Sequence, residues 1–254
     1  MALPSGWLGQ ADNFLGIDEP WCHPDQAGVY VLPAPYEHTS SYILGSDRGP
    51  SAIIEASQQV ELYDETLRYE PYREWGGVAT AATLNLDGRV DGPAVQAIQD
   101  FVQPHVGRGK FLVTLTGEHT GALGAIRAHA RNYPGMCVVQ IDAHGDLRQA
   151  YQDNPYSHAS VMARVVEDGL PLVQIGVRSI SPEEIDLIQK TPRIHTFFAA
   201  SILDPSGPYE GRAARWIPEV LAACTGPVYL TFDCDGLDAS LVPALGTPEP
   251  GGLG

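Results

Sequence analysis

The sequence predicts an α/β protein with a mainly parallel sheet, and two observations carry this prediction. From about residue 94 onward, short runs of consecutive apolar residues alternate with amphipathic stretches of helical spacing. Strands that are apolar on both faces are typical of parallel sheets with helices on both sides. We therefore expect a three-layer α/β/α sandwich.

The first part of the chain is expected to hold an arm and the first strand. Residues 1–27 carry three large aromatic residues among Gly, Pro and polar residues: Trp7, Phe14 and Trp21. This composition predicts an irregular arm that packs on the domain or on a neighbouring subunit. A strand over residues 28–35 is stopped by two prolines. A helix over residues 49–64 follows, with Pro50 near its start.

The rest of the chain predicts a regular alternation within one domain that spans residues 28–254. We expect helices over residues 94–106, 121–133, 158–169, 181–190 and 215–224. We expect strands over residues 110–116, 136–142, 171–177, 193–198 and 227–233. Gly169 is the expected stop of its helix, and Ser181 and Pro182 are typical of a helix start.

Charge and composition exclude several classes of partner. The 254 residues include 31 Asp and Glu against 15 Lys and Arg, a formal charge of -16. Nucleic acid and anionic membrane surfaces would be repelled, whereas cationic substrates or metal ions would be attracted. Acidity that serves only solubility is the simpler alternative. The four cysteines form no C-x-x-C pair, and no signal peptide or membrane span is recognisable, so we expect a reduced, cytoplasmic protein.

Polar residues follow three of the expected strands, at the edge where ligands bind in open parallel sheets. These residues are Glu118 and His119, then Asp142, His144 and Asp146, then Asp233, Asp235 and Asp238. Alternate positions of an extended segment point to the same side, so each cluster can converge on one point. A single D-x-H-x-D segment occurs by chance, but three clusters behind three buried strands indicate a common site.

The residue types indicate metal ions. Four clustered carboxylates repel one another unless cations lie among them. Oxygen ligands with a minority of imidazole nitrogens suit Mn²⁺ or Mg²⁺. Four aspartates and two histidines are too many for one ion and fit two ions that share carboxylates.

Several motifs resemble the arginase/agmatinase (ureohydrolase) family, particularly its prokaryotic agmatinases. "DAHGD" resembles the family's D-A-H-x-D signature, "FDCDGLDASLVPALGTPEPGG" its D-x-D-x-x-D-P segment, and "TGEHT" its G-G-D-H-S segment. "VLPAPYEHTSSYILGSDRGPSAIIEAS" is similar to the family's first-strand region, so the resemblance extends from residue 28 onward. It implies that two Mn²⁺ per chain are held by His119, Asp142, His144, Asp146, Asp233 and Asp235.

The resemblance also implies a reaction. Hydroxide held by two metals would attack a guanidinium carbon and yield urea and an amine, putrescine if the substrate is agmatine. His158, in "YSHAS", would shuttle protons. Glu118 and Asp238 would orient the ligand histidines or the metal loop. The family usually forms trimers or hexamers, so a homo-oligomer is expected.

The sequence departs from the family pattern at a few positions and leaves alternatives open. Thr116, Glu118, Ala159 and Ala239 replace the family's usual Gly, Asp, Gly and Pro. The sequence ends at "GTPEPGGLG", before the family's V-E-V-N-P-like segment, whose glutamate grips the guanidinium, so a truncated relative is expected. The alternatives are a metal-binding but inactive homologue, a hydrolase of guanidinobutyrate, guanidinopropionate, arginine or guanidine, and a one-zinc deacetylase of related fold.

Overall fold

The computed structural model describes residues 3–203 and 216–254. The chain forms two compact units. Unit 1 comprises residues 1–38 and 45–128, and unit 2 comprises residues 39–44 and 129–254. Each unit contains its own parallel sheet.

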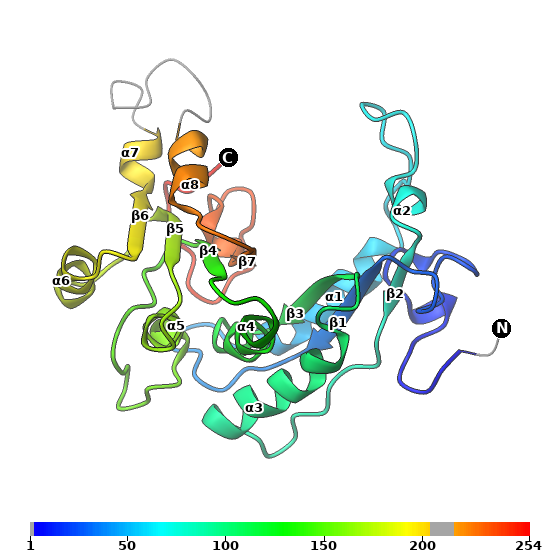
Figure 1. The fold of residues 1–254 in the computed structure, drawn as a ribbon, viewed down its shortest axis with the longest axis horizontal. Helices are drawn as coiled ribbons and strands as arrows, with labels where there is room; N and C mark the ends of the chain where they lie inside the picture. The colour runs from blue at the N-terminus through cyan, green and yellow to red at the C-terminus, as the bar shows by residue number, and fades with distance from the viewer. Residues whose placement is uncertain (1–2, 204–215) are drawn as a thin grey trace. The chain divides into compact units, whose positions relative to one another are not determined.

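Unit 1 is built on a three-stranded sheet of order β2-β1-β3 (Figure 1). Its strands are β1 (Val29–Ala34), β2 (Val78–Thr80) and β3 (Phe111–Thr116). Its helices are α1 (Gly49–Ser57), α2 (Pro71–Glu74), α3 (Asp91–Val102) and α4 (Thr120–Asn132), whose last residues belong to unit 2. Short 3-10 helices occupy Gln10–Asp12, Phe14–Gly16, Ser46–Arg48 and Gln103–His105.

Helix α1 is shorter than the sequence predicted. It ends at Ser57, whose hydroxyl donates to the carbonyl of Ile54 at 2.6 Å and accepts the N–H of Leu15 at 2.8 Å. Further on, the Asp64 carboxylate accepts the N–H groups of Thr66 and Leu67 and forms a turn. A side chain that bonds to its own backbone in this way competes with helix, so the predicted extension to residue 64 is wrong. The short β2 and α2 were not predicted.

Residues 3–27 pack within unit 1 without regular secondary structure apart from two 3-10 turns. Trp7 lies 4.5 Å from the Tyr30 ring, between centroids, and forms an antiparallel bridge with Ala81. The buried Asn13 side chain accepts the N–H of Thr80 and donates to the carbonyl of Val78. These contacts attach the segment to β1 and β2. The boundary at residue 27 stays a prediction.

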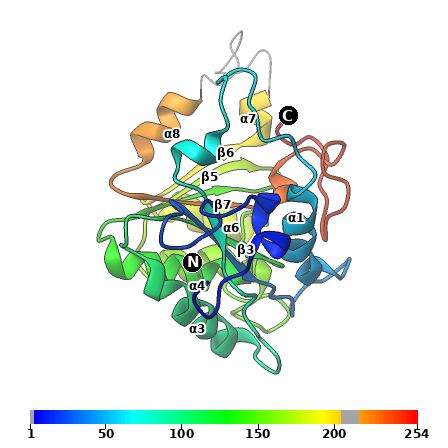
Figure 2. The same cartoon turned by 90° about the vertical axis from the view of Figure 1, so that its right-hand side faces the viewer.

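Unit 2 is built on a four-stranded parallel sheet of order β6-β5-β4-β7. Its strands are β4 (Cys137–Ile141), β5 (Leu172–Val177), β6 (Ile194–Phe198) and β7 (Val228–Phe232). Its helices are α5 (Val161–Glu167), α6 (Pro182–Lys190), α7 (Ala199–Leu203) and α8 (Ile217–Ala223), and 3-10 helices occupy His158–Ser160 and Cys234–Gly236. Figure 2 shows β5 and β6 side by side in this sheet.

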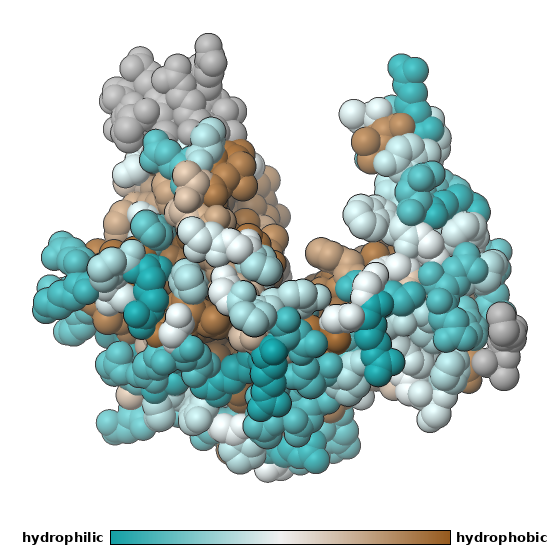
Figure 3. Space-filling model, viewed as in Figure 1, coloured by the Kyte–Doolittle hydropathy of each residue, from teal (hydrophilic) through white to brown (hydrophobic). Residues whose placement is uncertain are grey.

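The alternation of side chains along β4 and β5 gives the sheet of unit 2 two different faces. One face carries the apolar core of this unit, formed by Cys137, Val139, Val173, Ile175 and Val220 of α8. The neighbouring strand β7 exposes Leu230, and α8 exposes Leu221, so a hydrophobic surface extends over α8 and β7 (Figure 3). The opposite face of β4 and β5 carries buried glutamines instead.

The predicted α/β class with parallel strands is confirmed. The expected helix over residues 158–169 begins as a 3-10 turn and continues as α5, and Gly169 at φ +85° follows its end. The helix expected over residues 215–224 is present as α8, over Ile217–Ala223. Arg215, the first residue of the expected range, lies outside the described residues. Within the described ranges, no helix has the length and apolar character that crossing a membrane requires.

Candidate metal centre

Two loops of unit 2 meet at the carboxyl ends of neighbouring parallel strands. The β4 loop, residues 142–147, follows β4, and the β7 loop, residues 233–238, follows β7. Gly236 allows the close approach, since a Cβ at this position would lie 2.9 Å from the backbone nitrogen of Asp142. The sheet topology therefore brings together polar residues that lie about 90 positions apart in the sequence.

Three of the predicted ligands form one group in unit 2. Asp142, His144 and Asp235 each offer a ligand atom, and these atoms lie within 4.8 Å of one another. The His144 Nδ1 atom lies 3.0 Å from Asp235 Oδ2 and 3.5 Å from Asp142 Oδ1. Both carboxylates are buried, at 1% and 4% exposure, whereas His144 is partly exposed. The group thus lies where a cation would be shielded from solvent on one side.

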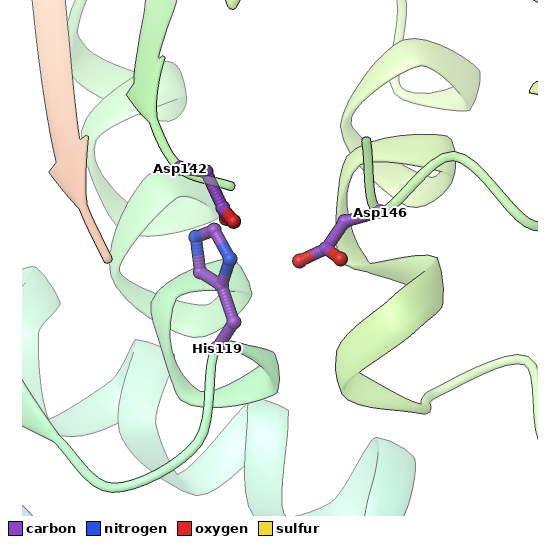
Figure 4. A group of neighbouring side chains, drawn as sticks. All are labelled: His119, Asp142 and Asp146. Atoms are coloured by element: carbon purple, nitrogen blue, oxygen red, sulfur yellow. The ribbon is translucent and has the colours of Figure 1, made fainter. Parts of the chain in front are cut away.

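Asp146 extends this arrangement along the same loop. Its carboxylate lies within 4.8 Å of a carboxylate oxygen of Asp142. Figure 4 shows the two carboxylates facing each other. Asp146 has a left-handed backbone with φ of 51°, which Asp tolerates better than most residues. Its carbonyl accepts the N–H groups of Met162 and Ala163 at the start of α5. The strained turn is therefore fixed by the helix that follows.

Hydrogen bonds within the two loops hold the carboxylates in place. Asp142 Oδ1 accepts the N–H of His144 at 2.7 Å. Asp235 Oδ1 accepts the N–H of Ala143 at 3.0 Å, which ties the β7 loop to the β4 loop. Asp235 therefore uses Oδ1 for this contact and presents Oδ2 to His144, whereas Asp142 Oδ1 both accepts the backbone N–H and faces the His144 ring.

The electrostatics of this group favour a bound cation. Burial and the neighbouring Asp142 charge raise the pKa of Asp235. Burial alone would lower the pKa of His144, but hydrogen bonds to Asp142 and Asp235 and the negative charges around it raise this pKa to about 11. An imidazolium thus compensates the carboxylates where a metal ion would otherwise do so.

The donor set fits hard divalent cations. The grouped atoms in unit 2 are carboxylate oxygens and one imidazole nitrogen, a combination that suits Mn²⁺ or Mg²⁺. Asp142 belongs both to the group with His144 and Asp235 and to the pair with Asp146, so it is in position to share two ions. The number and identity of the cations stay predictions.

His119 and Glu118 lie in unit 1, where the chain passes from β3 into α4. Both side chains are buried, and His119 is drawn at this turn in Figure 4. Glu118 Oε2 accepts the N–H of His38 at 2.8 Å, so it ties the segment after β1 to the end of β3. Their positions at the strand end agree with the sequence pattern, and their roles at the metal stay predictions.

Asp233 and Asp238 organise the β7 loop. Asp233 Oδ1 accepts the N–H of Asp235 at 3.3 Å and caps the short 3-10 helix there. Asp238 Oδ2 accepts the N–H groups of Gly251 and Gly252, so it attaches the last described segment to the loop. Within the described residues, Asp233 belongs to neither close group of ligand atoms, so its predicted role as a ligand stays a prediction.

His158 lies at the N-terminus of the 3-10 helix before α5. The Thr39 hydroxyl accepts the N–H of His158 at 2.9 Å and lies 3.1 Å from its Nδ1 atom. The Tyr151 ring packs edge-on against the imidazole. Thr39 and Tyr151 therefore fix the orientation of the ring, as a positioned proton carrier requires.

Two residues that organise the loops were not predicted from the sequence. The buried Glu184 accepts the N–H of Leu147 at 2.9 Å and that of Ser181 at 2.8 Å, so it connects the β4 loop to the start of α6. The S-x-x-E spacing of Ser181 and Glu184 is the capping-box pattern and was the available signal. The Arg178 guanidinium donates to the carbonyls of Asp235, Leu237 and Glu249, a role with no local sequence signal.

Comparison with known proteins finds one matching family and similar proteins within it. Residues 27–254 match the Arginase family. The chain is 43% identical over its whole length to an N(1)-aminopropylagmatine ureohydrolase of Synechocystis sp., of which it covers 81%. It is 30% identical over 91% of its length to an agmatinase of Bacillus anthracis, of which it covers 76%.

Solved structures share the fold. A hypothetical agmatinase of Burkholderia thailandensis superimposes with a TM-score of 0.78 at 25% identity over 100% of this chain and 80% of that chain. A putative agmatinase of Clostridium difficile gives a TM-score of 0.77 at 24% identity over 90% of this chain and 79% of that one. The likeness confirms the predicted α/β/α fold class.

Proposed function

The chain belongs to the arginase family, and from this premise we propose that it hydrolyses the guanidino group of an agmatine-like substrate to urea and an amine. The observation that carries the proposal is the group of buried Asp142, buried Asp235 and partly exposed His144, which has the donor types for a hard divalent cation. The family assignment favours this reaction over the deacetylase alternative.

We propose Mn²⁺ as the cofactor, with two ions per chain. Asp142, Asp146, His144 and Asp235 would hold them, and His119 and Asp233 would complete the set that the family motif implies. Such ions would supply the chemistry that this reaction needs, a water of lowered pKa that can act as the nucleophile. The carboxylates and His144 would fix the coordination geometry.

His158 is proposed to carry the proton that the leaving amine requires. Its ring is held by Thr39 and Tyr151, and an imidazole pKa is suited to proton transfer near neutral pH. Replacement with Asn is expected to lower kcat by about 10²- to 10⁴-fold, the usual contribution of a general acid. Mn²⁺ binding should be retained, because His158 lies outside the close groups of ligand atoms.

The substrate is proposed to be a cation of the agmatine class. The sequence motifs favour agmatine, and the 43% identical relative adds N(1)-aminopropylagmatine as a candidate. The formal charge of -16 favours either cation electrostatically. A homo-oligomer and a cytoplasmic location stay predictions, and light scattering after size-exclusion chromatography tests the first.

The decisive experiment is urea release by the purified chain loaded with Mn²⁺. Agmatine, N(1)-aminopropylagmatine, guanidinobutyrate, guanidinopropionate, arginine and guanidine form the panel, with His144→Ala as the blank. Urea from an agmatine-class compound, absent in the blank, is the expected result. A folded chain that binds Mn²⁺ and releases no urea from any compound would favour the inactive homologue and contradict the proposal.

A further inference from the structure

A row of polar side chains crosses the sheet of unit 2, and its member on β4 lies two residues before Asp142. Gln140 on β4 pairs in register with Gln174 on β5, which pairs with Thr196 on β6. On the other side, Thr231 of β7 is the register partner of Gln140. We call Gln140, Gln174 and Thr196 the polar row. Its face of the sheet is opposite to the apolar core formed by Val139, Val173 and Ile175.

The two glutamines of the polar row are completely buried, at 0% exposure. Burial of an amide without hydrogen-bond partners costs about 1–3 kcal/mol, and an apolar residue would fill the same space without that penalty. Strands β4 and β5 are otherwise apolar at most positions. Two glutamines side by side in such strands therefore indicate a task that apolar residues cannot perform.

The hydrogen bonds of the polar row run in one direction. The Thr196 hydroxyl donates to Gln174 Oε1 at 2.8 Å, and Gln174 Nε2 donates to Gln140 Oε1 at 2.7 Å. Gln140 Nε2 then donates to Asp142 Oδ2 at 2.8 Å. Because an ionised carboxylate only accepts hydrogen bonds, Asp142 fixes the orientation of the Gln140 amide and, through it, that of Gln174.

The same amides also hold the backbone of the β4 loop. Gln140 Nε2 donates to the carbonyl of His144 at 3.3 Å, and Gln174 Nε2 donates to the carbonyl of Gly145 at 2.7 Å. The carboxylate of Asp142 and the turn that carries His144 are thus attached to the interior of the sheet. This attachment comes from neutral donors, so it orients Asp142 without cancelling the negative charge that a cation needs.

We propose that Gln140, supported by Gln174 and Thr196, is a positioning residue that sets the orientation of Asp142 and the β4 loop for metal binding. This inference rests on the proposed function insofar as the ions belong to that reaction. Carboxylates that are oriented before binding lose less conformational freedom when the ion arrives, which raises affinity. The polar row thus determines how tightly the centre holds its cations.

The test is Mn²⁺ affinity of the metal-free chain, measured by titration calorimetry in the absence of any substrate. Gln140→Met removes both donors at similar volume and is expected to weaken Mn²⁺ binding about 10- to 100-fold, as loss of a hydrogen-bond partner of a metal ligand typically does. Gln99→Met is the matched control, because Gln99 is a buried glutamine of α3 in unit 1. We expect this control to keep its affinity within about twofold, well below the loss expected on removing a ligand's partner.

A second pair of variants tests the far end of the polar row and keeps the proposal testable if Gln140→Met does not fold. Thr196→Val removes the hydroxyl and is expected to lower Mn²⁺ affinity by less than Gln140→Met does but by more than the control does, and Thr196→Ser should restore the affinity. Thermal unfolding without metal shows whether each variant is folded. Wild-type affinity in folded Gln140→Met, or in Thr196→Val if the first variant does not fold, would overturn the proposal.

The outcomes separate this inference from the proposed function. If the wild-type chain binds Mn²⁺ and Gln140→Met binds it more weakly, but the wild type releases no urea, the inference about the polar row is supported and the proposed reaction is contradicted. If the wild-type chain releases urea and the variants bind Mn²⁺ as tightly as the wild type does, only the inference about the polar row is contradicted. A wild-type chain that binds no Mn²⁺ would overturn both.

Discussion

Glu184 offers a sharp test of how the β4 loop is held, through the change Glu184→Gln. The carboxylate accepts one backbone N–H with each oxygen, from Leu147 and from Ser181. A glutamine has only one acceptor oxygen, so its amide NH₂ group must face one of the two N–H donors. The fit is tight, since a Cβ at Gly145 would lie 3.0 Å from Glu184 Oε1.

The magnitude follows from these two contacts. A hydrogen bond to a charged group contributes about 1.5–3 kcal/mol, and an unpaired buried donor costs a similar amount. Glu184 is 4% exposed, so water cannot replace the lost acceptor. We expect Glu184→Gln to lower the free energy of unfolding by about 2 kcal/mol, and Glu184→Ala, which loses both acceptors, by roughly 3–5 kcal/mol.

The assay is urea denaturation of the metal-free chain followed by circular dichroism. An unchanged slope with a lower midpoint would identify a loss of stability rather than a change in compactness. Glu183→Gln is the matched control, because it makes the same chemical change at the neighbouring residue, which is exposed on α6. It should lower the midpoint much less than Glu184→Gln does, because Glu183 is exposed. Equal midpoints for the two variants would refute the reasoning that Glu184 attaches the loop to α6.

Three further predictions concern the same two loops. Gly236→Ala should destabilise the chain by about 1–3 kcal/mol, the usual cost of overpacking, because the new Cβ would lie 2.9 Å from the backbone nitrogen of Asp142. Thermal unfolding measures this loss of stability, and an unchanged melting temperature would contradict the close approach. Hydrogen bonds from Ser240, Gly252 and Gly251 lower the pKa of Asp238, so its contribution to stability is present above pH ~4 and is lost as the pH falls through the lowered folded pKa. Asp238→Asn should therefore be less stable than the wild type at pH 7, and this difference in stability should be much smaller in strong acid. A difference that stays constant over this pH range would show that the charge of Asp238 does not contribute to stability. Mn²⁺ at about 100 times its Kd should stabilise the metal-free chain by about 2.7 kcal/mol, and a folded Asp142→Ala variant should lose this gain, which a melting curve with and without Mn²⁺ measures.

Local patterns predicted most of the fold. The apolar runs that became β3, β4, β5, β6 and β7 were recognisable because buried parallel strands are apolar on both faces. Helix stops were predictable where the backbone requires them, as at Gly169. The extension of α1 was wrong because Ser57 and Asp64 bond to nearby backbone groups, and β2 is too short for a periodic signal.

The sequence by itself predicted which residues carry the chemistry, because alternate polar residues behind an apolar strand point to one side. It therefore gave Asp142, His144 and Asp235 as members of one site. Only the tertiary structure decided what holds them there. Gln140 and Gln174 are 34 positions apart and meet because neighbouring parallel strands place them side by side. Arg178 lies 57 positions from Asp235 and reaches its carbonyl because the segments after β5 and β7 end at the same edge of the sheet. Such long-range pairings follow from sheet register, which a local pattern does not contain.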